Sequence, residues 1–263
     1  MKKIALFAGI VFFAAACNNH TSDHQSSDNL SAKAQDLSQK VQQHPDSAGL
    51  RLQLVDALDS LNNYKEAAAQ MDLLIRKDSL NYGLWFRKAR LQESAKDTLQ
   101  AIEAYNKALH IYPSPDGMLS LANLLAEKKN ENALLLCQRV AELRLGREYI
   151  AHCSFISGVY YARTGNTERA LQAFDNCINN DFSYMEAYQE KGFIFYDAGK
   201  YADALKIFQM AAQVNNTYAD AYYWQAKCYE AMNQKAEAIK NYQTALGLDN
   251  QLKEAAAAIK RLQ

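Results

Sequence analysis

The chain has 263 residues, and its 29 lysine and arginine residues are balanced by 29 aspartate and glutamate residues. This length suits one extended domain or two small ones and is enough to bury a continuous core. No basic run is longer than the pair Lys128 and Lys129, so a nucleic-acid partner is not expected. With only 10 Gly and 3 Pro against abundant Ala, Leu, Gln, Glu and Lys, the composition favours helices over a turn-rich sheet fold.

The first 16 residues have the pattern of a secretory leader. Lys2 and Lys3 provide a basic start, and residues 4–16 carry no charge. A membrane-spanning helix needs about 20 apolar residues, so this run is too short to cross a bilayer. A charged start, a short apolar run and small residues at its end predict a leader over residues 1–16.

The leader ends with Ala14, Ala15 and Ala16 before Cys17. This arrangement resembles the lipobox of bacterial lipoproteins, although Ala14 stands where that family prefers Leu. The resemblance implies that Cys17 receives diacylglycerol and a fatty acyl chain such as palmitate and becomes the new N-terminus. Each buried methylene contributes about 0.8 kcal/mol, so two or three chains hold a protein firmly in a membrane. The alternatives are an ordinary cleaved leader or an N-terminal membrane helix with an incidental cysteine.

Residues 17–29 are predicted to form a flexible tether, because no apolar side chain follows Cys17 up to Asn29. Asn18 and not Asp follows the cysteine, which by resemblance favours the outer membrane over the inner membrane of the cell envelope; the leaflet stays open. An N-terminal capping helix is expected over residues 30–47, with Leu30 and Val41 on one face.

Residue types recur every 34 positions in the body of the chain. Five columns keep this step in the C-terminal half: Gly158, Gly192, Ala226; Tyr161, Phe195, Tyr229; Gly165, Gly199, Asn233; Ala170, Ala204, Ala238; and Phe174, Phe208, Tyr242. The pattern resembles the tetratricopeptide repeat (TPR), and Trp85, Ala89, Ala101, Tyr105 and Pro113 fill the same template in an earlier copy. The resemblance implies an all-α, right-handed α-solenoid of about six helix-turn-helix units with a terminal capping helix.

The solenoid is predicted over residues 48–252, as units at 48–81, 82–115, 116–150, 151–184, 185–218 and 219–252. A capping helix is predicted over residues 253–263. The unit at 116–150 is degenerate, because Ala133 lies 32 residues after Ala101 and 37 before Ala170. A break or hinge is therefore predicted there. Small residues such as Gly192 let the paired backbones approach, and aromatic side chains fill the space around them.

The sequence shows no catalytic constellation, so neither an enzyme nor a cofactor or metal site is expected. It contains no Gly-rich phosphate loop and no nucleophile elbow, and His20 and His24 fall in the predicted tether. Cys137 and Cys177 occupy core columns, which favours free thiols for the four cysteines of the body. A disulfide would have to join Cys137 to Cys153 or Cys177, because these come from adjacent units.

In the TPR family the first helices line the concave face, where extended peptides or partner helices usually bind. Carried onto this chain, the inward-facing offsets predict a protein-binding groove formed by Phe86, Arg90, Glu93, Phe155, Val159, Glu186, Gln189, Phe193, Tyr196, Tyr223, Lys227 and Glu230. Aromatic side chains rimmed by polar groups suit recognition of a protein surface. The expected function is a lipid-anchored scaffold or adaptor for other envelope proteins or peptides. The alternative is a self-associating structural lipoprotein without a peptide ligand, which would form homo-oligomers.

Overall fold

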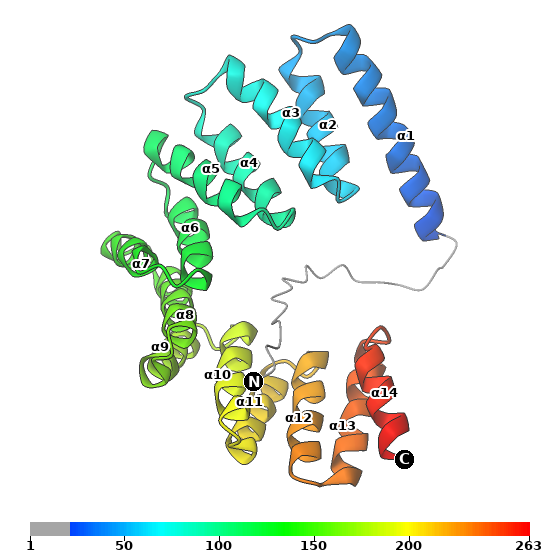
Figure 1. Cartoon of the computed structure of the whole chain (residues 1–263), viewed down its shortest axis with the longest axis vertical. Helices are drawn as coiled ribbons and strands as arrows, with labels where there is room; N and C mark the ends of the chain where they lie inside the picture. The colour runs from blue at the N-terminus through cyan, green and yellow to red at the C-terminus, as the bar shows by residue number, and fades with distance from the viewer. Residues whose placement is uncertain (1–21) are drawn as a thin grey trace. The chain divides into compact units, whose positions relative to one another are not determined.

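The computed structural model describes residues 22–263, with side chains from residue 29 onwards, and all its regular elements in that range are α-helices (Figure 1). Cys17, the predicted leader and the first part of the predicted tether lie outside the described residues. The helices are α1 (Ser22–Gln43), α2 (Ala48–Ser60), α3 (Tyr64–Lys77), α4 (Tyr82–Ser94), α5 (Thr98–Ile111), α6 (Pro115–Glu127), α7 (Asn132–Glu142), α8 (Arg147–Arg163), α9 (Thr167–Asn180), α10 (Met185–Asp197), α11 (Tyr201–Val214), α12 (Ala219–Ala231), α13 (Lys235–Leu248) and α14 (Lys253–Leu262).

The chain divides into two compact units, one ending at Ser79 and one spanning Leu80–Gln263. In the first unit α1 packs on α2 and α2 packs on α3. Leu37 and Val41 are buried there, as the predicted apolar face requires. The buried guanidinium of Arg51 donates hydrogen bonds to Gln70 Oε1 (2.6 Å) and to the carbonyl oxygen of Pro45 (3.2 Å).

The first helix corrects two predicted boundaries. It begins at Ser22, so residues 22–29 of the predicted tether are helical, and it ends at Gln43 instead of residue 47. The polar residues of this stretch lower helix propensity only modestly, and neither Gly nor Pro interrupts it. The helix stops before His44 because the ring of Pro45 disfavours a helical conformation in the residue that precedes it.

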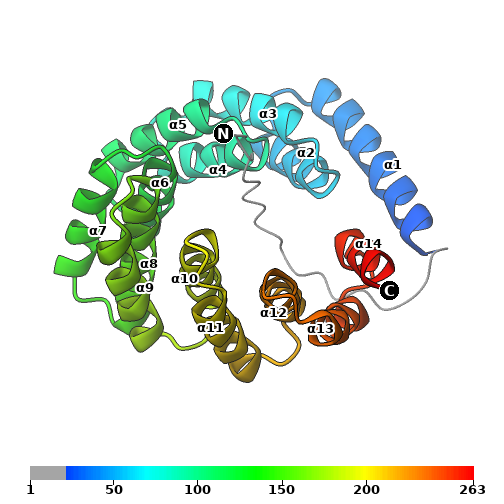
Figure 2. The ribbon, with the colours of Figure 1, turned by 60° about the horizontal axis from the view of Figure 1, so that its bottom comes forward.

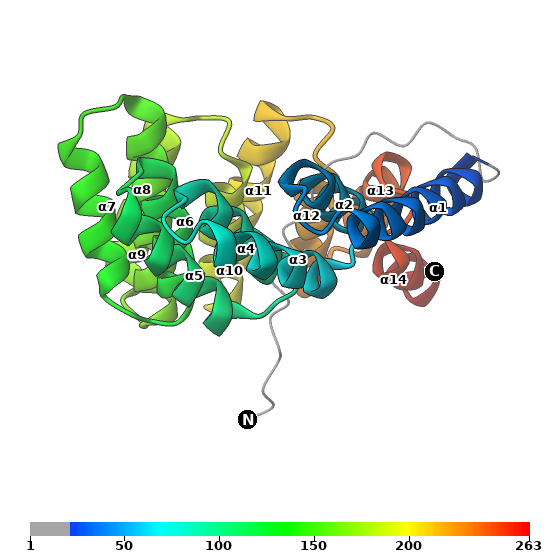
Figure 3. The same ribbon diagram turned by 90° about the horizontal axis from the view of Figure 1, so that it is seen from above.

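The second unit consists of helix pairs packed in series: α4 with α5, α6 with α7, α8 with α9, α10 with α11, and α12 with α13. Each pair also packs against the next one, and α14 lies beside α13 at the C-terminal end (Figures 1 and 3). Within this unit α4, α10 and α12 lie on the inner side of the stack, while α5, α11 and α13 lie on its outer side (Figure 2). The predicted all-α solenoid of helix pairs is confirmed.

The third pair in the chain, α6 and α7, departs from the others, as the irregular spacing of its alanines predicts. Its second helix, α7, has 11 residues, and the following helix, α8, has 17. Because α8 begins at Arg147, the predicted boundary between residues 150 and 151 is four residues too late. The short α7 ends at a loop that contains two left-handed residues, Arg144 (φ 53°) and Gly146 (φ 120°).

Aromatic rings fill the space between paired helices in two ways. A Cβ atom on Gly158 would come within 2.5 Å of the Phe174 ring, and one on Gly192 within 2.3 Å of the Phe208 ring. Close approach of the two backbones therefore requires glycine in these pairs. Where the ring belongs to a tyrosine, alanine takes the place of glycine: Ala89 occurs in the pair of Tyr105, and Ala226 in that of Tyr242.

The buried tyrosines need a hydrogen-bond acceptor, and a glutamate twelve residues earlier provides it. The Tyr105 hydroxyl donates to Glu93 Oε2 and the Tyr242 hydroxyl to Glu230 Oε2, both at 2.8 Å. At the equivalent positions of the phenylalanine pairs the chain has Ala162 and Tyr196 instead of glutamate. Glutamate thus occurs twelve residues before the ring where a buried tyrosine hydroxyl needs a hydrogen-bond acceptor.

Every first helix of the pairs from α2 to α12 ends at a left-handed residue. Gly165 (φ 83°) and Gly199 (φ 72°) serve in two pairs, and Asn62, Lys96, Lys129 and Asn233 adopt φ values of 59° to 60° in the others. Glycine adopts this conformation without the steric penalty that a Cβ atom imposes, which is roughly 1–2 kcal/mol.

Replacing Lys129 with glycine is therefore expected to raise the free energy of unfolding by about 1 kcal/mol, because it relieves a left-handed non-glycine residue after α6. Urea denaturation measures the change. The reverse substitution in the α8 turn, Gly165→Ala, is the matched control and should lower stability by a similar amount. Changes of the same sign in the free energy of unfolding for the two substitutions would contradict the turn geometry.

Candidate binding face

The predicted groove residues lie on α4, α8, α10 and α12, all within Leu80–Gln263. Arg90 and Glu186 are exposed. Nine others are half-buried: Phe86, Glu93, Phe155, Gln189, Phe193, Tyr196, Tyr223, Lys227 and Glu230. Half-buried side chains are held in place by neighbours while they keep a surface that a ligand can contact.

The prediction that Val159 lines the groove is wrong. Val159 is 1% exposed and belongs to the core, so it offers no surface to a partner. The reason lies in the packing of α8, which contacts α6, α7 and α9 and is covered on more than one side. Phe155, one turn earlier on α8, keeps partial exposure and packs against Tyr184 with ring centroids 4.9 Å apart.

Four aromatic side chains of α10 and α12 form a continuous cluster: Phe193, Tyr196, Tyr223 and Trp224. Trp224 is its centre, with ring centroids 4.5 Å from Phe193, 5.5 Å from Tyr196 and 5.7 Å from Tyr223. We call these four residues the aromatic cluster. Trp224 was not among the predicted residues, although one of only two tryptophans next to a predicted groove tyrosine is a signal that was present in the sequence.

A second aromatic contact lies on α4. Phe86 stacks on Tyr82 with centroids 5.5 Å apart and meets the edge of Tyr105 at 5.6 Å. Arg90 is exposed one turn after Phe86 on the same helix. The predicted residues of α4 therefore lie together, but they include a cation where α10 and α12 present mostly carboxylates.

The helices of the aromatic cluster carry an acidic surplus. The acidic residues of α10 and α12 are Glu186, Glu190, Asp197, Asp220 and Glu230, and their basic residues are Lys191 and Lys227. Lys191 is paired with Asp175 of α9, Glu190 with Arg163 of α8 and Glu230 with Arg261 of α14, so the remaining surplus comes from Glu186, Asp197 and Asp220. Gln189 lies among these carboxylates and accepts a hydrogen bond of 3.2 Å from the Tyr218 hydroxyl. This surface favours a partner that brings positive charge.

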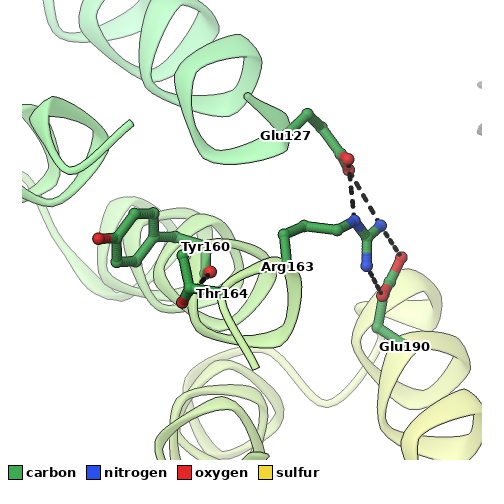
Figure 4. Close-up of polar contacts among 5 residues, drawn as sticks. All are labelled: Glu127, Tyr160, Arg163, Thr164 and Glu190. Atoms are coloured by element: carbon green, nitrogen blue, oxygen red, sulfur yellow. Dashed lines mark hydrogen bonds and ion pairs between the residues drawn. The ribbon is translucent and has the colours of Figure 1, made fainter. Parts of the chain in front are cut away.

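Arg163 holds three consecutive first helices together, a contact that sequence reasoning missed (Figure 4). From the end of α8 its guanidinium donates to both carboxylate oxygens of Glu127 of α6 (2.9 and 3.1 Å) and to both oxygens of Glu190 of α10 (3.0 Å each). Burial disfavours the charged guanidinium, but hydrogen bonds to the two glutamates outweigh it and raise the pKa of Arg163. We call these three residues the arginine bridge.

Glu93 and Glu230 occupy equivalent positions but differ in charge balance. Burial, the dominant effect, raises the pKa of Glu93 above its ordinary value of 4.5 despite the hydrogen bond from Tyr105. Burial also opposes the charge of Glu230, but hydrogen bonds from Tyr242 and from Arg261 (2.7 Å) outweigh it and lower the pKa of Glu230. The difference arises because Glu93 is more deeply buried and because α14 supplies a hydrogen-bonded cation next to Glu230.

Opposite effects of pH are therefore expected at the two positions. A raised pKa in the folded state means that Glu93 lowers stability progressively as pH rises from 4.5 through its folded value. A lowered pKa means that the contribution of Glu230 is present above 4.5 and is lost as pH falls through its folded value. Glu93→Gln should raise the free energy of unfolding at pH 7, whereas Glu230→Gln should lower it. Urea denaturation between pH 4 and 7 measures both; effects of the same sign would contradict this account.

The described residues contain no candidate metal site. No group of three His, Cys, Asp or Glu side chains in that part of the chain is arranged to hold a metal ion. His152 is engaged by Tyr184, with 3.0 Å between Nδ1 and the hydroxyl oxygen. No described helix combines the length and apolar character needed to cross a membrane. His20, one of the two tether histidines, lies outside the described residues.

Fold and site together define a helical repeat protein that presents aromatic and acidic side chains on its first helices. Two sequence models of the tetratricopeptide repeat match residues 52–116 and 195–262, which together make up more than half of the chain. The protein belongs to the tetratricopeptide repeat family. Typical members of this family are not catalysts.

Solved structures show the same fold at low sequence identity. A tetratricopeptide repeat protein from Parabacteroides merdae has a TM-score of 0.70 at 15% identity, over 92% of this chain and 95% of that one. PilW, described as a widely conserved type IV pilus biogenesis factor, has a TM-score of 0.64 at 17% identity, over 80% and 97%. The APC/C heterotetramer Cut9–Hcn1 scores 0.60 at 18% identity, over 92% of this chain and 48% of its own. No curated protein matches the sequence.

Proposed function

We propose that this protein is a lipid-anchored scaffold of the bacterial cell envelope, which binds extended segments of other envelope proteins on its first helices. The observation that carries the proposal is the aromatic cluster beside the acidic surplus of α10 and α12. Large aromatic side chains dominate binding energy at protein interfaces, and charge complementarity adds specificity and speed of association. The family to which the chain belongs supports binding of proteins or peptides.

The partner segment is expected to combine a large apolar side chain with basic residues. The apolar group would contact the partly exposed rings of Tyr196 and Tyr223, while the basic groups would lie near Glu186 and Asp220. Burial and the nearby charge of Asp249 raise the pKa of Asp220, so a bound cation would also relieve carboxylate repulsion at this end of α12. Binding should weaken as salt concentration rises, because salt screens these charges.

A charge reversal on the face tests the binding proposal directly. Native envelopes from cells that carry a tagged copy are cross-linked, and the proteins that co-purify are identified. Glu186→Lys should reduce recovery of the partner at least tenfold, whereas Glu103→Lys, an exposed charge reversal on the outer helix α5, should leave it unchanged. Tyr196→Ala is expected to act like Glu186→Lys. Absence of a specific partner, or equal recovery with all variants, would refute the scaffold proposal.

The membrane anchor is supported by the sequence before Cys17 and has its own test. Cells are grown with a palmitate analogue that carries a chemical handle, and the protein is examined for the label. We expect labelling of the wild-type chain and loss of both label and membrane association in Cys17→Ser. Labelling that survives in Cys17→Ser, or membrane retention without any label, would contradict lipidation at this residue.

Self-association is the second candidate, favoured by exposed apolar side chains around α7. Leu135 lies on α7, Leu143 and Leu145 lie in the loop after it, and Ile150 lies in the first turn of α8; all four are exposed. Contiguous exposed apolar residues commonly mark protein interfaces. Light scattering of the chain from Ser22 onwards distinguishes the candidates. A stable multimer that dissociates in a Leu143→Glu, Leu145→Glu double variant would support the structural role, and a monomer would exclude it.

A further inference from the structure

Two buried cysteines meet where the irregular third pair joins the fourth. Cys137 lies on α7 and Cys153 on α8, and both are free thiols in this structure. The Cys153 thiol donates a hydrogen bond to the carbonyl oxygen of Cys137, with 3.4 Å between Sγ and the oxygen, so the two cysteines are in direct contact. Both side chains are less than a tenth exposed. The pair is therefore already desolvated and brought together by the packing of α7 on α8.

Ser157, one turn after Cys153 on α8, lies beside the pair. The Ser157 hydroxyl donates to the carbonyl oxygen of Cys153 at 2.8 Å, so this backbone group is satisfied without the thiols. The contact with Cys153, together with burial, raises the pKa of Cys137, whereas the contact with Cys137 lowers the pKa of Cys153 although burial opposes this. Because the thiolate is the nucleophile in disulfide exchange, the lower pKa favours Cys153 as the first residue to react.

The helix that carries Cys137 is shorter than the helices on either side of it. With 11 residues, α7 is shorter than α6 and α8; its N-cap residue, Glu131, makes no side-chain hydrogen bond to the helix, and Asn130 Oδ1 accepts a hydrogen bond of 3.0 Å from the Asn132 amide instead. It is followed by the loop with left-handed Arg144 and Gly146. Short helices open more readily than longer ones, which gives an oxidant access to buried thiols.

We propose that Cys137 and Cys153 are a disulfide-forming pair that covalently braces α7 against α8 when the chain meets a disulfide oxidant, either a small-molecule disulfide or a protein oxidoreductase. The Cys153 thiolate attacks one sulfur of the oxidant, whose S–S bond breaks and releases one thiol. The Cys137 thiolate then attacks the Cys153 sulfur of this mixed disulfide and releases the second thiol. The two protein thiols lose two electrons and two protons, which the oxidant takes up as it becomes two thiols.

The brace should stabilise the irregular junction. It closes a loop between residues 16 positions apart, and a cross-link of this size restricts the unfolded chain substantially. For a protein of this length the expected rise in the thermal midpoint is roughly 6–12 °C. Cys177 and Cys228 are also buried but belong to α9 and α12, so they should stay reduced.

The test uses the full chain with Cys17→Ser, so that only the four body cysteines are counted. The protein is incubated with oxidised glutathione, quenched with acid, alkylated after unfolding and digested without reductant for mass spectrometry. We expect a peptide that links Cys137 to Cys153, two alkylated thiols at Cys177 and Cys228, and a thermal midpoint that falls when reductant is added.

Two variants distinguish the brace from a general effect of oxidant. Cys153→Ser should lose the redox-dependent shift in midpoint, whereas Cys228→Ser should keep it. If Cys153→Ser does not fold, the peptide map of the parent chain still shows whether Cys137 is linked to Cys153. Four alkylated thiols after oxidation, a bridge that includes Cys177, or an unchanged shift in folded Cys153→Ser would overturn the proposal.

Discussion

Phe174→Ala is expected to lower the free energy of unfolding by about 3–5 kcal/mol, the largest effect of any single substitution considered for this protein. Phe174 is 0% exposed and lies in the core between α8 and α9. Removing its ring leaves a cavity that the neighbouring helices cannot close completely. Urea denaturation measures the loss. Phe182→Ala is the matched control, because Phe182 is 70% exposed and its truncation should change stability by less than about 0.5 kcal/mol.

The cavity left by Phe174→Ala is expected to change the effect of Gly158→Ala on stability from destabilising to stabilising. Gly158→Ala alone should be destabilising by about 1–3 kcal/mol, because its Cβ atom would come within 2.5 Å of the Phe174 ring. In the Phe174→Ala background the ring is gone, and the gain in helix propensity of up to about 1 kcal/mol should make Gly158→Ala stabilising. Gly247→Ala controls for propensity, since a Cβ atom there meets none of the described atoms within 4 Å. If the effects of Gly158→Ala and Phe174→Ala on the free energy of unfolding simply add in the double variant, the Phe174 ring is not the reason for glycine at position 158.

Arg163→Met is expected to cost about 2–3 kcal/mol of unfolding free energy, because it leaves the carboxylates of Glu127 and Glu190 without their shared cation. The Arg163 side chain is 22% exposed, so the loss should be smaller than for a fully buried pair. Lys206→Met removes a cation from the exposed pair with Asp203 on α11 and should change stability by less than about 0.5 kcal/mol.

Neutralising the two glutamates separates loss of charge pairing from loss of packing. If the arginine bridge acts through charge, Glu127→Gln and Glu190→Gln should recover part of the stability in the Arg163→Met background, while each alone should be destabilising in the wild type. Thermal denaturation at low and high salt adds an independent readout, because salt should improve Arg163→Met relative to the wild type. A loss that no charge substitution changes would assign Arg163 a packing role only.

Much of the fold was predictable because each repeat contains its own local signals. The left-handed turns at Gly165 and Gly199, the glycines that face Phe174 and Phe208, and the regular step of the alanines are properties of a single helix pair. Eleven of the twelve predicted groove residues keep at least partial exposure for the same reason, since the offset within a helix decides which side faces its partner. The predictions failed where a residue's surroundings come from other pairs.

Each residue or contact that the sequence analysis predicted wrongly or missed has surroundings supplied by another helix pair or by another helix. Val159 is buried because α8 is covered by α6 and α7 as well as by α9, and its own offset carries no sign of that. The arginine bridge joins residues 36 and 27 positions apart. The first spacing exceeds the 34-residue step because the third pair is irregular, and the second is shorter because Glu190 lies in the middle of α10 whereas Arg163 lies at the end of α8. Trp224 was missed because the offsets considered each helix alone, whereas its ring contacts both α10 and α12.

By itself the sequence determined the helical fold, the pairing of helices and the side of each pair that remains accessible, because these depend on interactions within about 34 residues. Only the tertiary structure decided which side chains meet between pairs: the aromatic cluster, the arginine bridge and the contact of Cys137 with Cys153. Such contacts depend on the rotation and spacing from one pair to the next. That geometry results from the packing of every helix between them, so no single segment of the sequence encodes it.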